Sequence, residues 1–85
     1  MEHTSKEKPY VEQFTLTRVR SKPGAWVWVV DILDAYARWY SKTTGRSTTL
    51  SVDSFARILP PIGRSTRITQ DKKTLRARDG VELVW

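Results

Sequence analysis

The side chains that could perform acid–base or metal chemistry are few and scattered in this sequence. His3 is the only histidine and there is no cysteine, which excludes disulfides, thiolate zinc sites and cysteine nucleophiles. Asp31 and Asp34 lie three residues apart, but Asp31 is better explained as a helix cap. No glycine-rich phosphate loop precedes a helix. We therefore expect a protein that is not an enzyme, with no cofactor, no metal site and no small-molecule substrate.

Basic residues are the chemically distinctive feature of the chain, and they concentrate in its C-terminal half. The net charge is +6. Residues 1–41 hold six basic and five acidic residues, whereas residues 42–85 hold nine and four. Residues 57–78 contain seven basic residues and a single acid, Asp71. Such one-ended clustering is typical of a surface that binds a polyanion, so nucleic acid is the expected partner.

Length and composition bound the architecture. A chain of 85 residues is too short to divide into two cores, so we expect one domain over residues 9–85 behind a disordered tail, residues 1–8. Four Trp, three Tyr and two Phe suffice for a compact core. No apolar run approaches the roughly 20 residues of a membrane helix, and the N-terminus lacks the apolar stretch of a secretory signal. We expect no membrane contact and a cytoplasmic protein.

Apolar spacing predicts two helices in the first half of the chain. The first spans residues 9–20. After a turn at residues 22–24, residues 25–30 form either a short strand or the entry to the next helix, and are buried in both cases. Asp31 is the predicted cap of the second helix, which reaches about Lys42 and has the clearest amphipathic pattern. Its aromatic residues are expected in the core rather than on a base-stacking platform.

The second half predicts one further helix and a basic hairpin. Residues 43–49 form a polar loop, and Ser51 caps a helix over residues 52–59 that Pro60 ends. Residues 64–70, 74–77 and 81–85 are candidate strands. Turn signals lie at residues 70–73 and at residues 78–80, where Asp-Gly favours a hairpin. Which of the two turns is the tip stays open.

Two exposed tryptophans would indicate a protein-binding surface. Because neighbouring strand residues point to opposite faces, at least one of Trp26 and Trp28 is expected in the core. The other, together with Trp85, could be exposed, and such an aromatic pair would favour protein contact or self-association. The alternative for Trp85 is that it closes the hairpin against the core.

The order of these elements predicts an α+β fold, a winged helix-turn-helix with three helices, a short strand and a C-terminal β-hairpin wing. The helix around residues 51–59 and the basic wing around residues 64–80 would then bind duplex DNA. Lys and Arg neutralise phosphates, Ser and Thr donate hydrogen bonds, and Arg57 is the candidate for a guanine contact. The candidate DNA-binding residues are Arg46, Thr49, Ser51, Ser54, Arg57, Arg64, Arg67, Lys72, Lys73, Arg76 and Arg78.

Residues 31–62 also resemble two winged-helix groups. The similarity is carried by Leu33-x-x-Tyr36-x-x-Trp39 and by Leu50-Ser51-x-x-Ser54-Phe55-x-Arg57-x-Leu59. The stretch is similar to the C-terminal module of primase–helicases from phages and mobile elements, and to the DNA-binding domain of the regulatory factor X family. The resemblance implies a winged-helix fold and DNA binding, with Arg57 and Arg67 at basic positions of the second family.

The sequence departs from that family at two places. Ala56 stands where the family has Gly, and residues 71–80 replace its Gly-rich wing and Tyr-rich strand. The family's wing contacts are therefore not transferred to this chain.

We expect a small DNA-binding regulator of transcription, or an accessory factor of replication or recombination, of phage or mobile-element type. It would act in the cytoplasm, at the nucleoid or in a phage host. Two alternatives stay open. A winged helix can instead be a protein-interaction module, such as a host-factor inhibitor or an assembly module. The same charge pattern also permits RNA binding.

Overall fold

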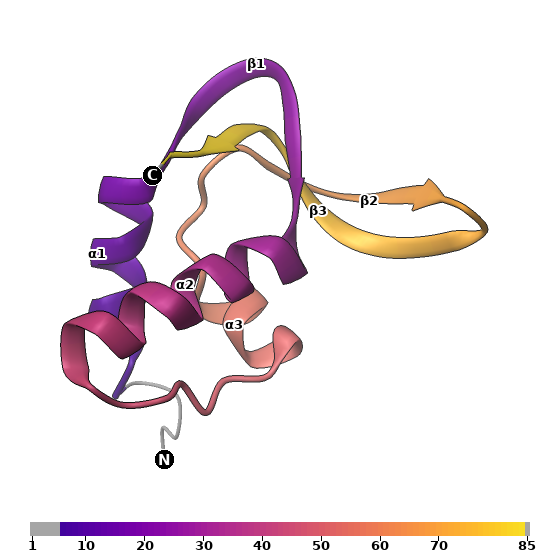
Figure 1. The fold of residues 1–85 in the computed structure, drawn as a ribbon. Coiled ribbons are helices and arrows are strands. Elements are labelled where there is room, and N and C mark those ends of the chain that lie inside the picture. Colours follow the sequence, from indigo (N-terminus) through magenta and orange to yellow (C-terminus); the bar gives the residue numbers. More distant parts are fainter. Residues whose placement is uncertain (1–5, 85) are drawn as a thin grey trace.

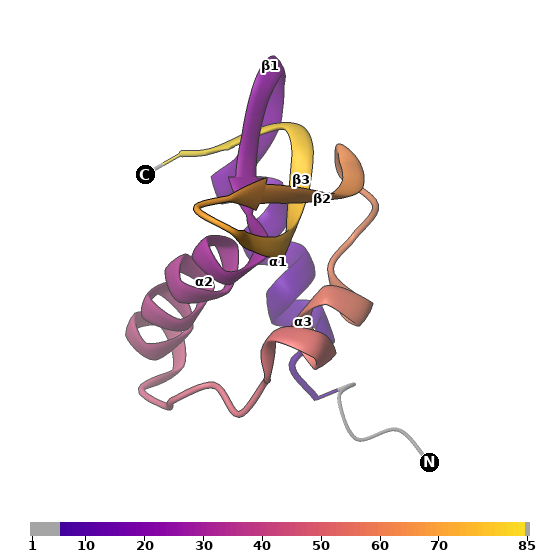
Figure 2. The same ribbon diagram turned by 90° about the vertical axis from the view of Figure 1, so that its right-hand side faces the viewer.

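The computed structural model describes residues 6–84, which form three α-helices and one three-stranded antiparallel sheet (Figure 1). The expected mixed α+β class is confirmed. Figure 2 shows the sheet lying over the helices. None of the helices in this part of the chain has the length and apolar character needed to cross a membrane. The elements in order are α1 (Lys8–Arg18), β1 (Val19–Trp28), α2 (Val29–Thr44), α3 (Val52–Ile58), β2 (Arg64–Gln70) and β3 (Lys73–Leu83).

Strand β3 is the centre of the sheet and pairs with β1 on one side and β2 on the other. Its second half pairs with β1 in two segments, residues 19–21 and residues 26–28. Between them the register shifts, and β1 arches outward at the predicted turn, where Gly24 has a φ of 88° (Figure 1). Strand β2 spans the predicted residues and pairs with the first half of β3. The β2–β3 hairpin projects away from the helices (Figure 1).

The hairpin tip is the turn at residues 70–73, which settles the choice that the sequence left open. Asp71 and Lys72 have φ of 54° and 65°, the paired positive values of a two-residue hairpin turn. The expected turn at residues 78–80 is wrong, because these residues lie within β3. Gly80, with a φ of 82°, instead lies where the register with β1 shifts, as glycine does in a β-bulge. The two expected C-terminal strands are therefore one.

Three predicted boundaries in the first half need correction. The first helix ends at Arg18, because residues 19–21 pair with β3. The expected tail of residues 1–8 extends too far: α1 begins at Lys8 and Glu7 is buried, while residues 1–5 lie outside the described part. Asp31 is not the cap of α2. Trp28 occupies that position and Asp31 lies in the first turn, where a carboxylate still favours the positive end of the helix dipole.

The core forms where the three helices meet the sheet, and Tyr36 of α2 is its hub. The Tyr36 ring packs against Phe14 of α1 at 5.6 Å between centroids and against Phe55 of α3 at 5.4 Å. Tyr40 stacks on the same ring at 5.5 Å. All four are buried, and Val81 of β3 joins the cluster. The prediction that the aromatic residues of α2 belong to the core is confirmed for Tyr36 and Tyr40, and Trp39 is half-buried and packs against that core.

A buried carboxylate, Glu7, ties the helices together at their base. Its Oε1 accepts hydrogen bonds from the Tyr36 hydroxyl at 2.8 Å and the Thr48 hydroxyl at 2.6 Å. Its Oε2 accepts from the backbone N–H and the hydroxyl of Thr49, both at 3.2 Å. Burial alone would raise the pKa of Glu7, but these four donors outweigh it and hold the pKa below its usual value. The charged form is thus part of the fold.

We predict that Glu7→Gln destabilises the protein and makes its stability less dependent on acidic pH. An amide cannot accept from all four donors, so the free energy of unfolding at neutral pH should fall by about 2 kcal/mol. Because the folded pKa is lowered, the Glu7 contribution is complete above the unfolded pKa of about 4.3 and disappears as the pH falls through the folded value. Urea unfolding across this pH range measures both effects. Glu12→Gln, at an exposed site on α1, is the matched control. It should change neither the stability at neutral pH nor its dependence on acidic pH.

The segment between α3 and β2 crosses close over β3 at Gly63. Gly63 has a φ of 62°, and a Cβ there would overlap the backbone oxygen of Asp79 and the Cγ1 of Val81. Only glycine fits both the dihedral angle and the approach. This close approach holds the base of the β2–β3 hairpin near the end of α3.

We predict that Gly63→Ala costs about 3 kcal/mol of unfolding free energy, since it adds a backbone clash to the strain of positive φ. Gly24→Ala is the matched control. Gly24 has a similar φ of 88° but nothing within 4 Å of the added methyl, so only the conformational cost of about 1 kcal/mol remains. Thermal or denaturant unfolding compares the two. Equal losses would show that the close approach contributes nothing.

Candidate nucleic-acid interface

The register of the hairpin assigns its side chains to two faces, because directly opposite residues of an antiparallel pair share a face. Arg67 lies opposite Arg76, and Ser65 opposite Arg78. These four residues therefore share one face. It is the face turned toward the helices, since Arg76 contacts Asp53 at the start of α3 with 3.1 Å between Nη1 and Oδ1.

A hollow between α3 and this face of the hairpin is lined by arginine side chains from three elements. Arg57 contributes from the last turn of α3, Arg67 from β2, and Arg76 from β3. Ser65 adds a hydroxyl group from the same face of the hairpin, and Ala56 and Val29 add apolar surface. We call the three cations Arg57, Arg67 and Arg76 the arginine groove. Each of them has an exposed side chain.

The cross-strand pair Arg67–Arg76 is electrostatically unfavourable for the protein alone, because like charges directly opposite each other destabilise a sheet. Among residues 6–84, the one acid in an ion pair with a groove arginine is Asp53, which contacts Arg76. The Arg76 and Asp53 side chains are 42% and 72% exposed. An ion pair this exposed contributes at most about 1 kcal/mol, so an incoming anion can displace it. The groove can hold an anion such as a backbone phosphate.

Arg78 was predicted to bind DNA, but its side chain serves the fold. It is 7% exposed, and its Nη1 donates to the carbonyl oxygens of Pro60 at 3.2 Å and Ile62 at 3.1 Å. Burial lowers the pKa of the Arg78 guanidinium, although an arginine remains charged. Arg78 thus attaches β3 to the segment that follows α3 through its Nη1, and it also lines the hollow.

The other predicted site residues lie in four different places. Lys72 and Lys73 lie at the hairpin tip, while Arg64 lies opposite Asp79 on the far face of the sheet. Ser51 caps α3 as predicted: its hydroxyl oxygen accepts from the Ser54 backbone N–H at 3.2 Å and also contacts the Ser54 hydroxyl. These two hydroxyls are therefore mainly occupied with each other.

Arg46 and Thr49 lie in the loop between α2 and α3, where they line a separate hollow beside Glu7. The Thr49 hydroxyl donates to that carboxylate. The structure does not bring these two residues to the arginine groove.

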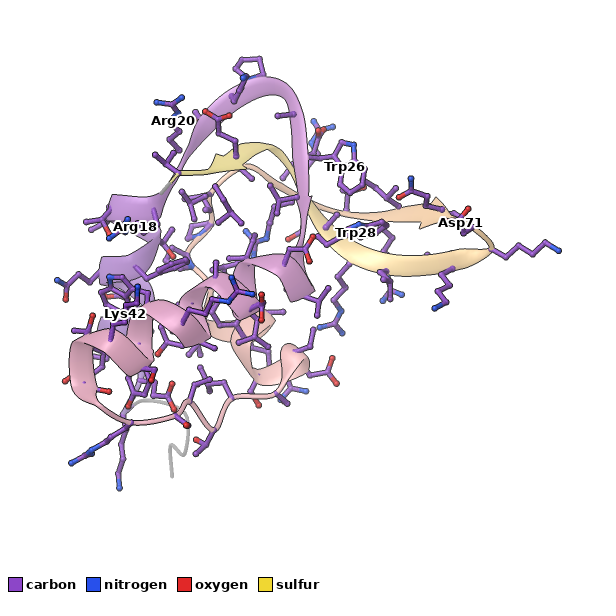
Figure 3. All side chains as sticks on the ribbon, in the orientation of Figure 1. Arg18, Arg20, Trp26, Trp28, Lys42 and Asp71 are labelled. Carbon is purple, nitrogen blue, oxygen red and sulfur yellow. The ribbon has the colours of Figure 1, made fainter. Side chains whose placement is uncertain are left out.

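Sequence reasoning missed a second group of cations, Arg18, Arg38 and Lys42, which surround Trp39. Figure 3 shows Arg18 and Lys42 on the opposite side of the molecule from the hairpin tip. Arg38 also pairs with Asp34 one turn earlier, with 3.1 Å between Nη2 and Oδ2. The spacing of Arg38 and Lys42 places them on one helix face, but only the packing of α1 on α2 adds Arg18.

The prediction for the tryptophans of β1 is wrong. Trp26 and Trp28 are two residues apart and therefore share a face, and their rings make an edge-to-face contact at 4.8 Å. Val27, between them, packs against the core. Neither tryptophan is buried, and the expected burial of residues 25–30 holds only for Val29. Trp85 lies outside the described residues.

No protein-family model, curated protein or solved structure matches this chain. Its function therefore has to be inferred from the geometry of residues 6–84.

We predict that Arg78→Ala lowers the free energy of unfolding by about 2–3 kcal/mol, because two carbonyl oxygens lose a charged donor and a buried side chain is removed. Arg67→Ala removes the same charge from an exposed site on the neighbouring strand and should change stability by less than about 0.5 kcal/mol. Urea unfolding of the two variants measures the difference. Similar losses in the two variants would contradict the conclusion that Arg78 stabilises the fold while Arg67 does not.

Proposed function

We propose that the chain is a winged helix-turn-helix domain that binds duplex DNA without acting on it chemically. The observation that carries the proposal is the arginine groove, in which α3 and both strands of the hairpin bring Arg57, Arg67 and Arg76 to one hollow. Cations fixed in this way neutralise backbone phosphates and release condensed counterions. No covalent chemistry is needed for that role.

The topology supports the winged-helix assignment. The order of elements α1-β1-α2-α3-β2-β3, with β3 between β1 and β2, supplies a helix pair followed by an antiparallel hairpin. Helices α2 and α3, joined by residues 45–51, would be the helix-turn-helix, and the β2–β3 hairpin would be the wing. The polar loop and the basic hairpin that the sequence predicts agree with this arrangement.

The hairpin, rather than α3, is the main contact surface in this proposal. Helix α3 has seven residues, and it exposes Val52 and Asp53 beside Arg57. A carboxylate at that place repels phosphates, so α3 offers one cation for DNA. The hairpin supplies Arg67 and Arg76 on its groove face and Lys72 at its tip. We therefore expect affinity to come mainly from phosphate contacts of the wing, with Arg57 as the candidate for a base contact.

A domain of this kind suits a small regulator of transcription, or an accessory factor in replication or recombination. The resemblance to modules of phages and mobile elements supports that setting. The protein would then act in the cytoplasm, at the nucleoid or in a phage-infected host.

A second candidate function is that of a protein-interaction module, and exposed apolar side chains favour it. Trp26 is 39% exposed and Leu75 44% exposed, and Val30 and Val52 border a hollow beside β3. The two functions differ in the strength and salt dependence of binding to duplex DNA. RNA binding would be distinguished from both by a competition experiment, in which duplex RNA displaces the labelled duplex DNA.

We predict that a labelled random duplex binds with a steep salt dependence that Arg67→Ala/Arg76→Ala reduces. Each lost phosphate contact lowers the slope of log K against log salt by about 0.9, so the double variant should lose about 1.8. Fluorescence anisotropy across a salt series measures the slopes. Unlabelled duplex RNA as competitor separates the two kinds of duplex.

The matched control is Arg38→Ala/Lys42→Ala, which removes the same net charge from the other side of the molecule. Its slope should stay near that of the unmodified protein. If both double variants lower the slope equally, the binding is explained by the net charge of the protein and not by the arginine groove. Absence of duplex binding at low salt would leave the protein-interaction function as the better candidate.

A further inference from the structure

The face of the sheet that points away from the arginine groove carries a row of apolar side chains. Trp28 lies across from Ala77 and Thr66, and Trp26 across from Asp79 and Arg64. One step toward the tip, Leu75 lies opposite Ile68 on the same face. Figure 3 shows both indoles beside the base of the hairpin. We call the four residues Trp26, Trp28, Ile68 and Leu75 the tryptophan face.

The tryptophan face is accessible and held by regular structure. Trp26 and Leu75 are 39% and 44% exposed, and Trp28 and Ile68 are half-buried. The two indoles meet edge to face, with 83° between their planes, so each ring limits the motion of the other. Small side chains at Ala77 and Thr66 in the Trp28 row leave room for the large ring. An aromatic surface fixed on strands is suited to stacking with flat groups.

The size of this face argues against a second copy of the chain as its occupant. Three strands about 4.8 Å apart and seven residues of about 3.4 Å give on the order of 300 Å². A stable interface needs about 800 Å² from each partner. Residues 64–79 also hold six basic and two acidic residues, so two hairpins placed face to face would repel each other.

The charges at the ends of the face favour an anionic partner. Arg64 lies in the Trp26 row next to Asp79, and Lys73 lies opposite Gln70 on the same face, so two cations on this face stand against one carboxylate. Six residues of strand separate the two rows, or about 20 Å. A partner that combines flat apolar groups with regular negative charge matches cations at both ends of an aromatic row. Nucleobases on a phosphate backbone have this combination, and single-stranded sites begin at about four nucleotides.

We propose that the tryptophan face binds single-stranded nucleic acid, with bases stacked on Trp26 and phosphates held by Arg64 and Lys73. The bases must be unpaired, because a duplex buries its base faces within its own stack. This goes beyond the proposed duplex site, which uses the opposite face of the same hairpin. The two sites together suit a junction between a duplex and a single strand.

The test compares binding of a labelled oligothymidylate of about 12 nucleotides and of a blunt duplex by fluorescence anisotropy at low salt. Trp26→Ala should weaken oligothymidylate binding about tenfold, as expected for one lost base–aromatic stack. Trp26→Phe keeps an aromatic ring and should stay within about threefold of the unmodified protein. Leu16→Ala is the matched control, an apolar side chain 84% exposed on α1, and should have no effect. Duplex affinity should be unchanged in all three variants.

A second variant guards against loss of folding, which circular dichroism detects. If Trp26→Ala does not fold, Leu75→Ala, at an exposed site of the same face, should weaken oligothymidylate binding about threefold. The proposal is overturned if the unmodified protein does not bind oligothymidylate, or if folded Trp26→Ala binds it equally well. It is also overturned if light scattering shows a dimer that Trp26→Ala dissociates.

Failure of this inference and failure of the duplex function are distinguishable. Arg67→Ala/Arg76→Ala should abolish most duplex binding and leave the Trp26-dependent part of oligothymidylate binding in place. If only the effect of Trp26→Ala is absent, the tryptophan face is a site of another kind while the duplex function stands.

Discussion

The buried carboxylate of Glu7 is the interaction on which the arrangement of the helices depends. It joins the start of α1 to Tyr36 in the middle of α2 and to Thr48 and Thr49 in the loop that leads to α3. Burial, together with the hydrogen bond to Glu7, raises the pKa of Tyr36, so its hydroxyl remains a donor. Because the loop is fixed at this point, the start of α3 and its distance from the hairpin are fixed as well. Glu7 thus holds the loop from which α3, the helix that carries Arg57, begins.

Contacts of β3 attach the hairpin to the rest of the fold. Within the hairpin, one arginine makes such contacts and two others are exposed. Arg78 is satisfied by two backbone carbonyl oxygens and is buried. Arg67 and Arg76 form the next residue pair on the same face, and within residues 6–84 their one acceptor is Asp53, which pairs with Arg76. Since a buried cation must be compensated, these two contacts give Arg78 a structural role. The exposed pair is under no such requirement and is available to an external anion.

The sequence predicted much of the fold because local signals agree with it. The amphipathic spacing of α2, the Ser51 cap and the alternation over residues 64–70 each reappear in the structure. The failures concern contacts between distant segments. Glu7 looked like part of a polar tail because its partners lie 29 to 42 residues away. Residues 78–80 looked like a turn because only the pairing of Arg78 and Asp79 with both β1 and β2 makes this segment part of a strand.

The candidate site was predictable in outline but not in detail, because its details also depend on contacts between distant segments. Charge clustering indicated a basic hairpin, but the division of its arginines between the fold and the groove follows from strand register, which composition does not contain. Trp26 and Trp28 illustrate this, since their spacing of two places them on one face while tertiary packing decides which face is covered. A sheet built for stability alone would not place Arg67 opposite Arg76. Their repulsion, left in place beside a single exposed carboxylate, is best explained by an anion that relieves it, and this local conflict with stability is the physical reason to look for function there.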